Sequence, residues 1–128
     1  MTLAAILLTL VAPMPAEQAA FTICGDARRV TCVVDGDTFW LDRVKYRIAD
    51  IDAPEVSNPQ CRAEAEAANR ATLRLQTLLN GGPIELRTQG LDRYGRTLTT
   101  VWRNGRSLGA VMVQEGHARQ WGDRRGWC

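Results

Sequence analysis

The 128-residue chain has the length of one small domain, with 45% hydrophobic residues, a net charge of +2 and four cysteines. Its single histidine argues against a histidine-ligated metal site and against a Ser/His catalytic pair. No CxxC pair occurs in the sequence, which argues against a zinc ribbon and against a thioredoxin-like redox site.

The N-terminal stretch LAAILLTLVA, residues 3–12, is apolar but shorter than the roughly 20 residues that span a bilayer. Together with the PMPAEQAA that follows, it is similar to the apolar region and cleavage zone of a signal peptide, although no Lys or Arg precedes it. We therefore expect a leader over residues 1–20, a domain over 21–128, secretion or export to the periplasm, and no stable membrane span. An N-terminal strand and a tethering segment are the alternatives.

Residues 30–34, 38–41 and 44–50 are rich in β-branched and aromatic residues, which predicts three strands. Asp42-Arg43 fits a tight turn between the second and third of them, and Gly36 suggests a bulge or bend after the first.

Residues 61–79 change to a helical period. Ala65, Ala68, Thr72, Leu75 and Leu79 recur at steps of three and four, which predicts one apolar face. The sequence NGGP, residues 80–83, then predicts the end of the helix.

Two further strands are predicted over residues 84–88 and 97–102, and Asn104-Gly105 forms a turn signal. Ser107 is a candidate N-cap for a short helix over 108–115 that Gly116 ends. This order predicts an α+β fold with a five-stranded OB-type barrel, one helix between strands three and four, and a second short helix after strand five. An open sheet is the alternative.

Acidic residues gather at the ends of the predicted strands. Asp35 and Asp37 are two residues apart, as are Asp50 and Asp52, so each pair points to one face if the backbone is extended. Two carboxylates about 4 Å apart repel by on the order of 4 kcal/mol at an effective dielectric of 20. A bound cation would turn this repulsion into attraction, and oxygen ligands suit calcium or magnesium rather than zinc. For any one of these aspartates taken alone, the favoured interpretation is an ordinary turn or solvent-exposed residue.

The sequence also contains candidate catalytic groups, two of them close to these acids. Glu55 follows Pro54 and could act as a general base on water, while Arg47 and Arg96 could hold the oxygens of a phosphate. All strong bases except Lys45 are arginines, whose planar fork binds phosphate bidentately. One hard cation, one base and two arginines are sufficient to cleave a phosphodiester.

The motifs VVDGDTFWL (33–41), RIADIDAPE (47–55) and DRYGRTL (92–98), in this order, resemble the staphylococcal nuclease, or thermonuclease, family. GRSLGAVMVQEGHA (105–118) is similar to the second helix of that family. The resemblance covers about Val30 to Ala118. It implies an OB-type barrel and calcium-dependent hydrolysis of DNA and RNA that leaves 3′-phosphates.

The resemblance also implies roles for individual residues. Arg47, Glu55 and Arg96 match the catalytic positions, with the two arginines on the phosphate and the glutamate orienting or deprotonating the attacking water. The matches to calcium-binding positions are Asp37, Asp52 and the backbone carbonyl of Ala53, with Asp35 beside them. The matches to substrate-binding positions are Arg93 and Tyr94, with Trp121 as a substitute for a base-stacking tyrosine. For Trp127 we expect packing in the core.

Four cysteines allow three disulfide pairings. We favour Cys24–Cys32 as a local closure and Cys61–Cys128 as a clamp on the C-terminal segment. The leading interpretation is an exported, monomeric, calcium-dependent endonuclease acting on DNA and/or RNA. The alternatives are a non-catalytic OB- or Tudor-like module that binds nucleic acid or protein, and a structural domain of the cell envelope.

Overall fold

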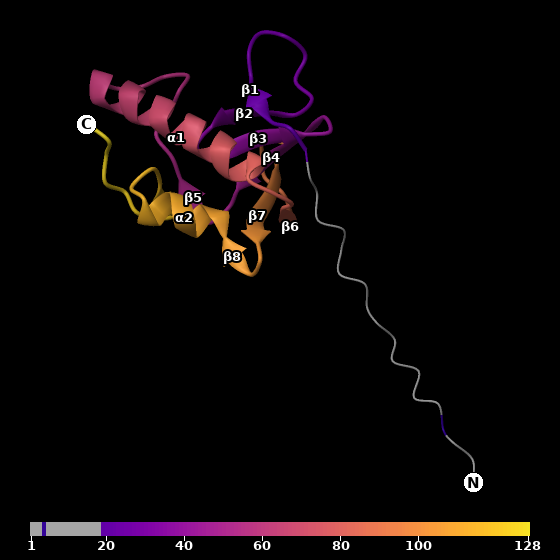
Figure 1. Ribbon diagram of the computed structural model, residues 1–128. Coiled ribbons are helices and arrows are strands. Elements are labelled where there is room, and N and C mark those ends of the chain that lie inside the picture. Colours follow the sequence, from indigo (N-terminus) through magenta and orange to yellow (C-terminus); the bar gives the residue numbers. More distant parts are fainter. Residues whose placement is uncertain (1–3, 5–18) are drawn as a thin grey trace.

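The computed structural model describes Ala4 and residues 19–128, so the leader expected over residues 1–20 lies almost entirely outside the described residues. A sheet of seven strands forms the larger part of the fold, with the order β1-β2-β3-β4-β7-β6 and β8 beside β7 (Figure 1). Its strands are β1 (Thr22–Ile23), β2 (Cys32–Asp35), β3 (Thr38–Leu41), β4 (Val44–Ile48), β6 (Glu85–Leu91), β7 (Thr97–Arg103) and β8 (Arg106–Ser107). A separate pair joins β5 (Ile51–Asp52) to β9 (Arg119–Gln120).

The β3–β4 hairpin has the predicted tight turn at Asp42-Arg43. Thr38 pairs with Arg47 at one end of this hairpin, and Leu41 pairs with Val44 at the other. Asp42 and Arg43 form the two-residue turn with φ values of 49° and 71°. Two positive φ values suit the right-handed twist of a hairpin, so the turn fixes the register that places Arg47.

Helix α1 (Arg62–Asn80) begins at Cys61, whose Sγ accepts a hydrogen bond of 3.3 Å from the backbone N–H of Glu64. Its buried residues include the expected Ala68, Thr72, Leu75 and Leu79. Burying this face against β2 and the core drives the helix onto the sheet, because isolated helices are only marginally stable.

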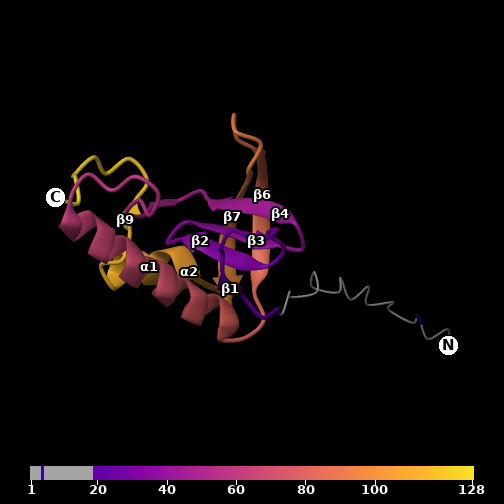
Figure 2. The same cartoon turned by 90° about the horizontal axis from the view of Figure 1, so that it is seen from above.

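Helix α2 (Leu108–Gln114) has the predicted N-cap, since the Ser107 hydroxyl accepts a hydrogen bond from the backbone N–H of Ala110 at 3.1 Å. Both helices lie to one side of the strands in two perpendicular views (Figures 1 and 2). The core between them contains the stacked rings of Phe39 and Tyr46, with centroids 5.3 Å apart, and the fully buried Met112.

Both expected disulfides are confirmed. Cys24–Cys32 closes the loop between β1 and β2, and Cys61–Cys128 ties the C-terminal residue to the start of α1. The second bridge links positions 67 residues apart, so it holds the segment after β9 against the main body of the fold.

The expected five strands need correction in number and extent. The α+β content with two helices is confirmed, but the pairings among residues 19–128 describe an open strand path, not a closed barrel. The strand expected over 44–50 ends at Ile48, and the chain resumes as β5, which pairs with β9. Among the helices described, none is long and apolar enough to cross a membrane.

Candidate active site

The carboxylate of Asp37 is fixed at the bend between β2 and β3. It is 5% exposed and accepts hydrogen bonds from the Thr38 hydroxyl at 3.0 Å and from the backbone N–H of Ala53 at 2.8 Å. Gly36 allows this approach, because a Cβ there would lie 2.8 Å from the Cβ atoms of both Ala53 and Ala71. Asp37 therefore joins the first acidic motif to the second.

Arg47 is buried at the centre of the same region, with 7% of its surface exposed. Its Nη1 donates to the carbonyl oxygens of Ile48 and, at 2.8 Å, of Ile51. Its Nη2 lies 3.4 Å from Asp37 and 3.6 Å from Asp52. The guanidinium thus fixes the backbone after β4 and separates two carboxylates that would otherwise repel each other.

Asp52 is positioned by the short β5–β9 pair, in which it lies opposite Arg119. Its side chain is 47% exposed, so it is far more accessible than Asp37. Arg119 donates through Nη1 to the carbonyls of Arg125 and Gly126 and lies 4.2 Å from the centre of the Trp127 ring. The C-terminal segment therefore supports the strand that supports Asp52.

One open pocket of about 740 Å³ brings most of the predicted residues together. The sequence-predicted residues in its wall are Asp35, Asp37, Arg47, Asp52, Glu55, Arg93, Tyr94, Arg96 and Trp121. Ala53 is 4% exposed and is not among the residues that line it. The four cysteines lie elsewhere, in the two bridges.

The pocket concentrates negative charge. Burial and then the charge of Asp37 raise the pKa of Asp35 from 3.8 to about 8. Partial burial and the same neighbour raise the pKa of Asp52, and partial burial with Asp37 and Asp52 raises the pKa of Glu55. Burial is the larger cause for each group and repulsion from neighbouring carboxylates adds to it, so a further positive charge would be favourable here.

A second arginine reaches the pocket from the loop between β6 and β7. The Nε of Arg96 donates to Asp92 at 2.7 Å, and Asp92 also accepts the backbone N–H groups of Tyr94 and Arg96, both at 2.9 Å. Burial would raise the pKa of Asp92, but its hydrogen bonds from Arg96 and Tyr94 outweigh burial and lower it. The loop is thus held by its own first residue.

Aromatic surface flanks these charges. Trp121 is 68% exposed, its ring centre lies 5.6 Å from the Arg47 guanidinium, and its backbone N–H donates to Asp50 at 3.0 Å. Tyr94 is 67% exposed, and its hydroxyl accepts a hydrogen bond of 2.7 Å from Arg93. Both rings are available to stack on a planar group, as aromatic platforms in nucleic-acid-binding proteins do.

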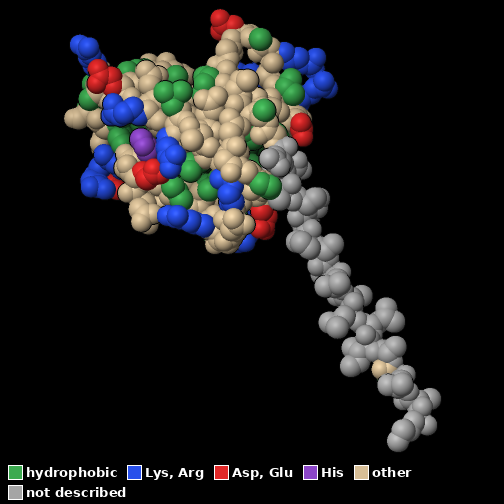
Figure 3. Space-filling view, viewed as in Figure 1, with side chains coloured by type: hydrophobic (Ala, Val, Ile, Leu, Met, Phe, Trp, Pro, Cys, Tyr) green, Lys and Arg blue, Asp and Glu red, His purple; other side chains and the backbone are tan. Residues whose placement is uncertain are grey.

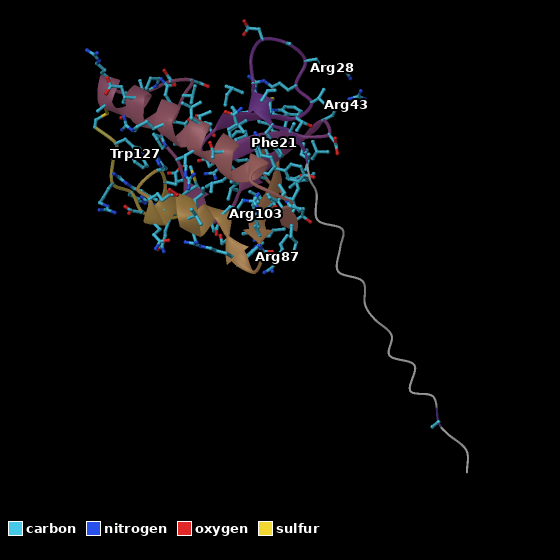
Figure 4. All side chains as sticks on the ribbon, viewed as in Figure 1. Phe21, Arg28, Arg43, Arg87, Arg103 and Trp127 are labelled. Carbon is cyan, nitrogen blue, oxygen red and sulfur yellow. A yellow bond between two sulfur atoms is a disulfide. The ribbon has the colours of Figure 1, made fainter. Side chains whose placement is uncertain are left out.

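Trp127 requires correction, because it is half-buried against Arg119 in the C-terminal segment and is not part of the core (Figure 4). The sequence interpretation also missed the contributions of Asp92 and Arg119. A signal for Asp92 existed, because an aspartate that opens a glycine-containing loop commonly bonds the backbone two residues later. No local signal marks Arg119, whose role depends on pairing with a distant two-residue strand.

The donors of the acid cluster fit a cation. Asp35, Asp37 and Asp52 offer only oxygen ligands, which suit a hard divalent ion, and a cation would offset the burial and the mutual repulsion that raise the pKa of Asp35 and of Asp52. Within residues 19–128 and Ala4, no three acidic, cysteine or histidine side chains form a ready-made metal cluster. The oxygen donors therefore fit a hard divalent cation, although the described acids are not already grouped around a single point.

Comparison with known proteins gives an independent result. The model of the family described as staphylococcal nuclease homologues matches residues 45–125. The chain is 26% identical over 110 residues to a thermonuclease of Staphylococcus intermedius, which covers 82% of this chain and 66% of that protein. It is 33% identical over 102 residues to a micrococcal nuclease of Shigella flexneri, with 70% of this chain and 55% of that protein covered.

A third relative is endonuclease YncB of Bacillus subtilis, which is 30% identical over 95 residues. That match covers 67% of this chain and 44% of the relative. The chain therefore spans between about half and two thirds of the length of the three relatives it matches.

Proposed function

Because the chain belongs to the staphylococcal nuclease family, we propose that it is a calcium-dependent phosphodiesterase that cuts DNA and/or RNA as an endonuclease. The observation that carries the proposal is the common pocket of Arg47, Glu55 and Arg96 with Asp37 and Asp52. A binding module would need basic and aromatic surface, but it would have no use for a glutamate of raised pKa beside a cation-favouring acid cluster.

The two arginines hold the phosphate from different sides. Arg47 comes from β4 and Arg96 from the β6–β7 loop, so their guanidinium groups line the pocket from separate elements, and each would donate to a non-bridging oxygen in exchange for a contact with an acid. Negative charge on these oxygens grows as the reaction proceeds, and fixed donors stabilise that charge more than they stabilise the bound substrate.

Glu55 acts on the attacking water. Its raised pKa makes it a stronger base than an ordinary carboxylate, and its exposed side chain at the pocket mouth leaves room for water. Glu55 takes a proton from the water as the water oxygen forms a bond to phosphorus and the bond from phosphorus to the 5′-oxygen breaks. The 5′-oxygen takes up a proton from solvent, and the phosphate stays on the 3′-oxygen of the other fragment.

Asp37 and Asp52 would hold the calcium ion together with the carbonyl of Ala53, with Asp35 beside them. The ion would supply positive charge to a phosphate oxygen and to the water. Before binding, Arg47 is the group that lies between Asp37 and Asp52. Its fixed backbone contacts keep both carboxylates directed to the same place.

We further propose that the protein is monomeric and works in an oxidising compartment, either outside the cell or in the periplasm. Two disulfides that involve all four cysteines support the oxidising compartment, because such bonds persist in oxidising environments. A cytosolic enzyme of this size would keep its cysteines reduced.

The test is digestion of plasmid and single-stranded DNA and of RNA by the wild type and Glu55→Gln, each with calcium or with chelator. We expect cleavage by the wild type with calcium and none with chelator. Loss of a catalytic base lowers the rate by about 10²–10⁴-fold. Glu66→Gln is the matched control, since Glu66 lies on the exposed face of α1 and pairs only with Arg62.

Two outcomes would count against the proposal. If the wild type binds single strands with calcium present but never cleaves them, the chain is a binding module. If Glu55→Gln and Glu66→Gln cleave at the same rate, Glu55 is not the base even though the protein is a nuclease. Analysis of the product ends separates cleavage on the 5′-oxygen side from cleavage on the 3′ side.

A further inference from the structure

Three arginines lie together at the end of the β3–β4 hairpin that is opposite the catalytic pocket. Arg28 and Arg29 belong to the loop closed by the Cys24–Cys32 disulfide, and Arg43 belongs to the hairpin turn. In Figure 4, Arg28 and Arg43 extend from this loop and this turn, whose backbones are joined by a hydrogen bond, and Figure 3 shows basic side chains gathered beside the same loop. We call Arg28, Arg29 and Arg43 the arginine cluster.

The two segments that carry the cluster are fixed to each other. The backbone N–H of Arg43 donates to the carbonyl of Val30 at 2.9 Å, and that of Asp42 donates to the hydroxyl of Thr31 at 3.2 Å. The disulfide and the left-handed turn hold each segment from within. The arginines are therefore presented on a rigid support, although each side chain is exposed to solvent.

The side chains of the cluster have no protein partner. Across the described part of the chain, Arg28, Arg29 and Arg43 enter no ion pair, side-chain hydrogen bond or ring contact, whereas Arg47, Arg74 and Arg96 are all paired with acids. Asp26 and Asp42 belong to the same segments but form no ion pair with the cluster in the described structure. Three unpaired guanidinium groups on two joined segments favour an external anion with several charges.

The cluster is connected to the pocket along one strand. Lys45 and Arg47 are two residues apart on β4, so they point to the same face, and Lys45 lies 6.0 Å from the centre of the Trp40 ring. The hairpin turn lies roughly 13 Å from Arg47 along the strand, at about 3.3 Å per residue. A single strand spans up to several ångströms per nucleotide, so a site of a few nucleotides, within the range of about 4–16 known for single-strand-binding domains, is long enough to cover this distance.

From this arrangement we propose that the arginine cluster is a second phosphate-binding surface, which holds a polynucleotide several nucleotides away from the bond that is cut. The inference rests on the proposed function, since it extends the substrate beyond the phosphate in the pocket. This second surface would make the enzyme bind long strands more tightly than short ones. An anionic lipid surface would also attract free arginines, but it would have no reason to lie in line with Lys45 and Arg47.

The test compares two variants that change charge equally. R28Q/R29Q removes two cluster arginines, and R62Q/R70Q removes two exposed arginines from α1, outside the pocket. Both change the net charge of +2 by the same amount. Binding of a fluorescent 20-mer and of a dinucleotide is measured in chelator, so that no cleavage is needed, at several salt concentrations.

We expect R28Q/R29Q to bind the 20-mer about 5- to 25-fold more weakly at about 0.1 M salt, because one phosphate contact on a single strand contributes a factor of about 5 there and two contribute about 25. The salt slope should fall by roughly 1.4, at about 0.7 for each phosphate contact on a single strand. Dinucleotide binding should not change, and R62Q/R70Q should bind both probes like the wild type.

With calcium, R28Q/R29Q should raise the KM for long strands and leave kcat unchanged. Equal 20-mer binding by the two double variants would overturn the inference, even if the wild type cleaves DNA. Loss of binding to vesicles of phosphatidylglycerol and phosphatidylcholine, with 20-mer binding intact, would also overturn it in favour of a membrane surface. If the wild type never cleaves but R28Q/R29Q loses 20-mer binding, the second surface stands and only the catalytic proposal fails.

Discussion

The two arginines of the candidate site are held in opposite ways. Arg47 is buried and is bonded to the carbonyls of Ile48 and Ile51 and to two acids from other parts of the chain. Arg96 lies in a surface loop, and its acidic partner Asp92 is four residues away in the same loop. The half of the pocket formed by Arg47, Asp37 and Asp52 is therefore part of the fold, and we call it the fixed half. The other half, formed by Arg96 and Asp92, is a loop whose contacts are local.

The comparison shows that two arginines of one pocket can differ in role. Arg47 stabilises the fold as well as lining the pocket, whereas Arg96 lines the pocket and contributes little to the stability of the fold. Replacing Arg47 removes bonds on which the path of the backbone depends. Replacing Arg96 removes bonds within one loop, which the sheet does not need. Variants of the two arginines should therefore differ in which property they lose.

The largest expected effect is the loss of stability in Arg47→Gln. Removing one partner of a buried ion pair leaves Asp37 uncompensated, which costs about 3–5 kcal/mol of unfolding free energy. Urea unfolding in chelator measures it, with Arg96→Gln as the control. A comparable loss in both variants would mean that the loop is as much part of the fold as β4, and the contrast would be lost.

The second effect concerns rate. Arg96→Lys should cleave DNA about 10²–10³-fold more slowly, as expected when one fixed donor to developing charge is removed, since an ammonium group does not reproduce the planar fork. Its unfolding free energy should stay within about 0.5 kcal/mol of the wild type, as for most surface substitutions. The checks are kcat on single strands and a urea titration. A large loss of stability with unchanged kcat would reverse the assignment.

Calcium should stabilise the fold through the fixed half of the pocket and not through the loop of Arg96, because its proposed ligands belong to the fixed half. At about 100 times its dissociation constant, calcium should raise the unfolding free energy by roughly 2.7 kcal/mol. Asp37→Asn should lose this gain, since the amide keeps an acceptor for the Ala53 N–H but not the charge. Thermal melts with and without calcium measure it. Asp92→Asn should retain the gain, and its loss there would place the ion in the loop.

The sequence contained enough information to predict the fixed half of the site, because its parts belong to regular elements. The tight turn at Asp42-Arg43 sets the hairpin register, and the register sets Arg47 against Thr38. The apolar period of 61–79 likewise predicted a helix close to α1. Hydrophobic periodicity and turn residues act over a few positions, so a single sequence is enough to predict the helices, strands and turns that depend on them.

What escaped prediction depends on distant contacts. The β5–β9 pair joins two-residue strands that are too short to show a period, yet it positions Asp52 and directs Arg119 towards the C-terminal segment. Trp127 was assigned to the core on its hydrophobicity, but the Cys61–Cys128 bridge holds its segment at the surface, where the ring lies over Arg119. The open strand path depends on how the strands pair in space, and local patterns do not encode that.

The smallest expected effect is the dependence of stability on pH that comes from the loop. Hydrogen bonds from Arg96 and Tyr94 lower the pKa of Asp92 below its ordinary value of 3.8, although burial acts in the opposite direction. A carboxyl group whose pKa is lower in the folded than in the unfolded state stabilises the fold above its unfolded pKa and loses that contribution as the pH falls. The wild type should therefore be more stable than Asp92→Asn at pH 7, and the difference should vanish as the pH falls from about 4 through the lowered pKa.

Urea titrations of both proteins between neutral and acid pH check this, and the size should be modest because exposed ion pairs contribute little. Asp26→Asn is the matched control, since Asp26 is an exposed loop residue with no ion pair in the described structure. If the unfolding free energy of Asp92→Asn equals that of the wild type at every pH, the bond between Asp92 and Arg96 does not stabilise the fold. Arg96 can then exchange Asp92 for a phosphate without loss of stability. If the difference persists in acid, the backbone bonds to Asp92 hold the loop without its charge, and Arg96 is preorganised by the turn itself.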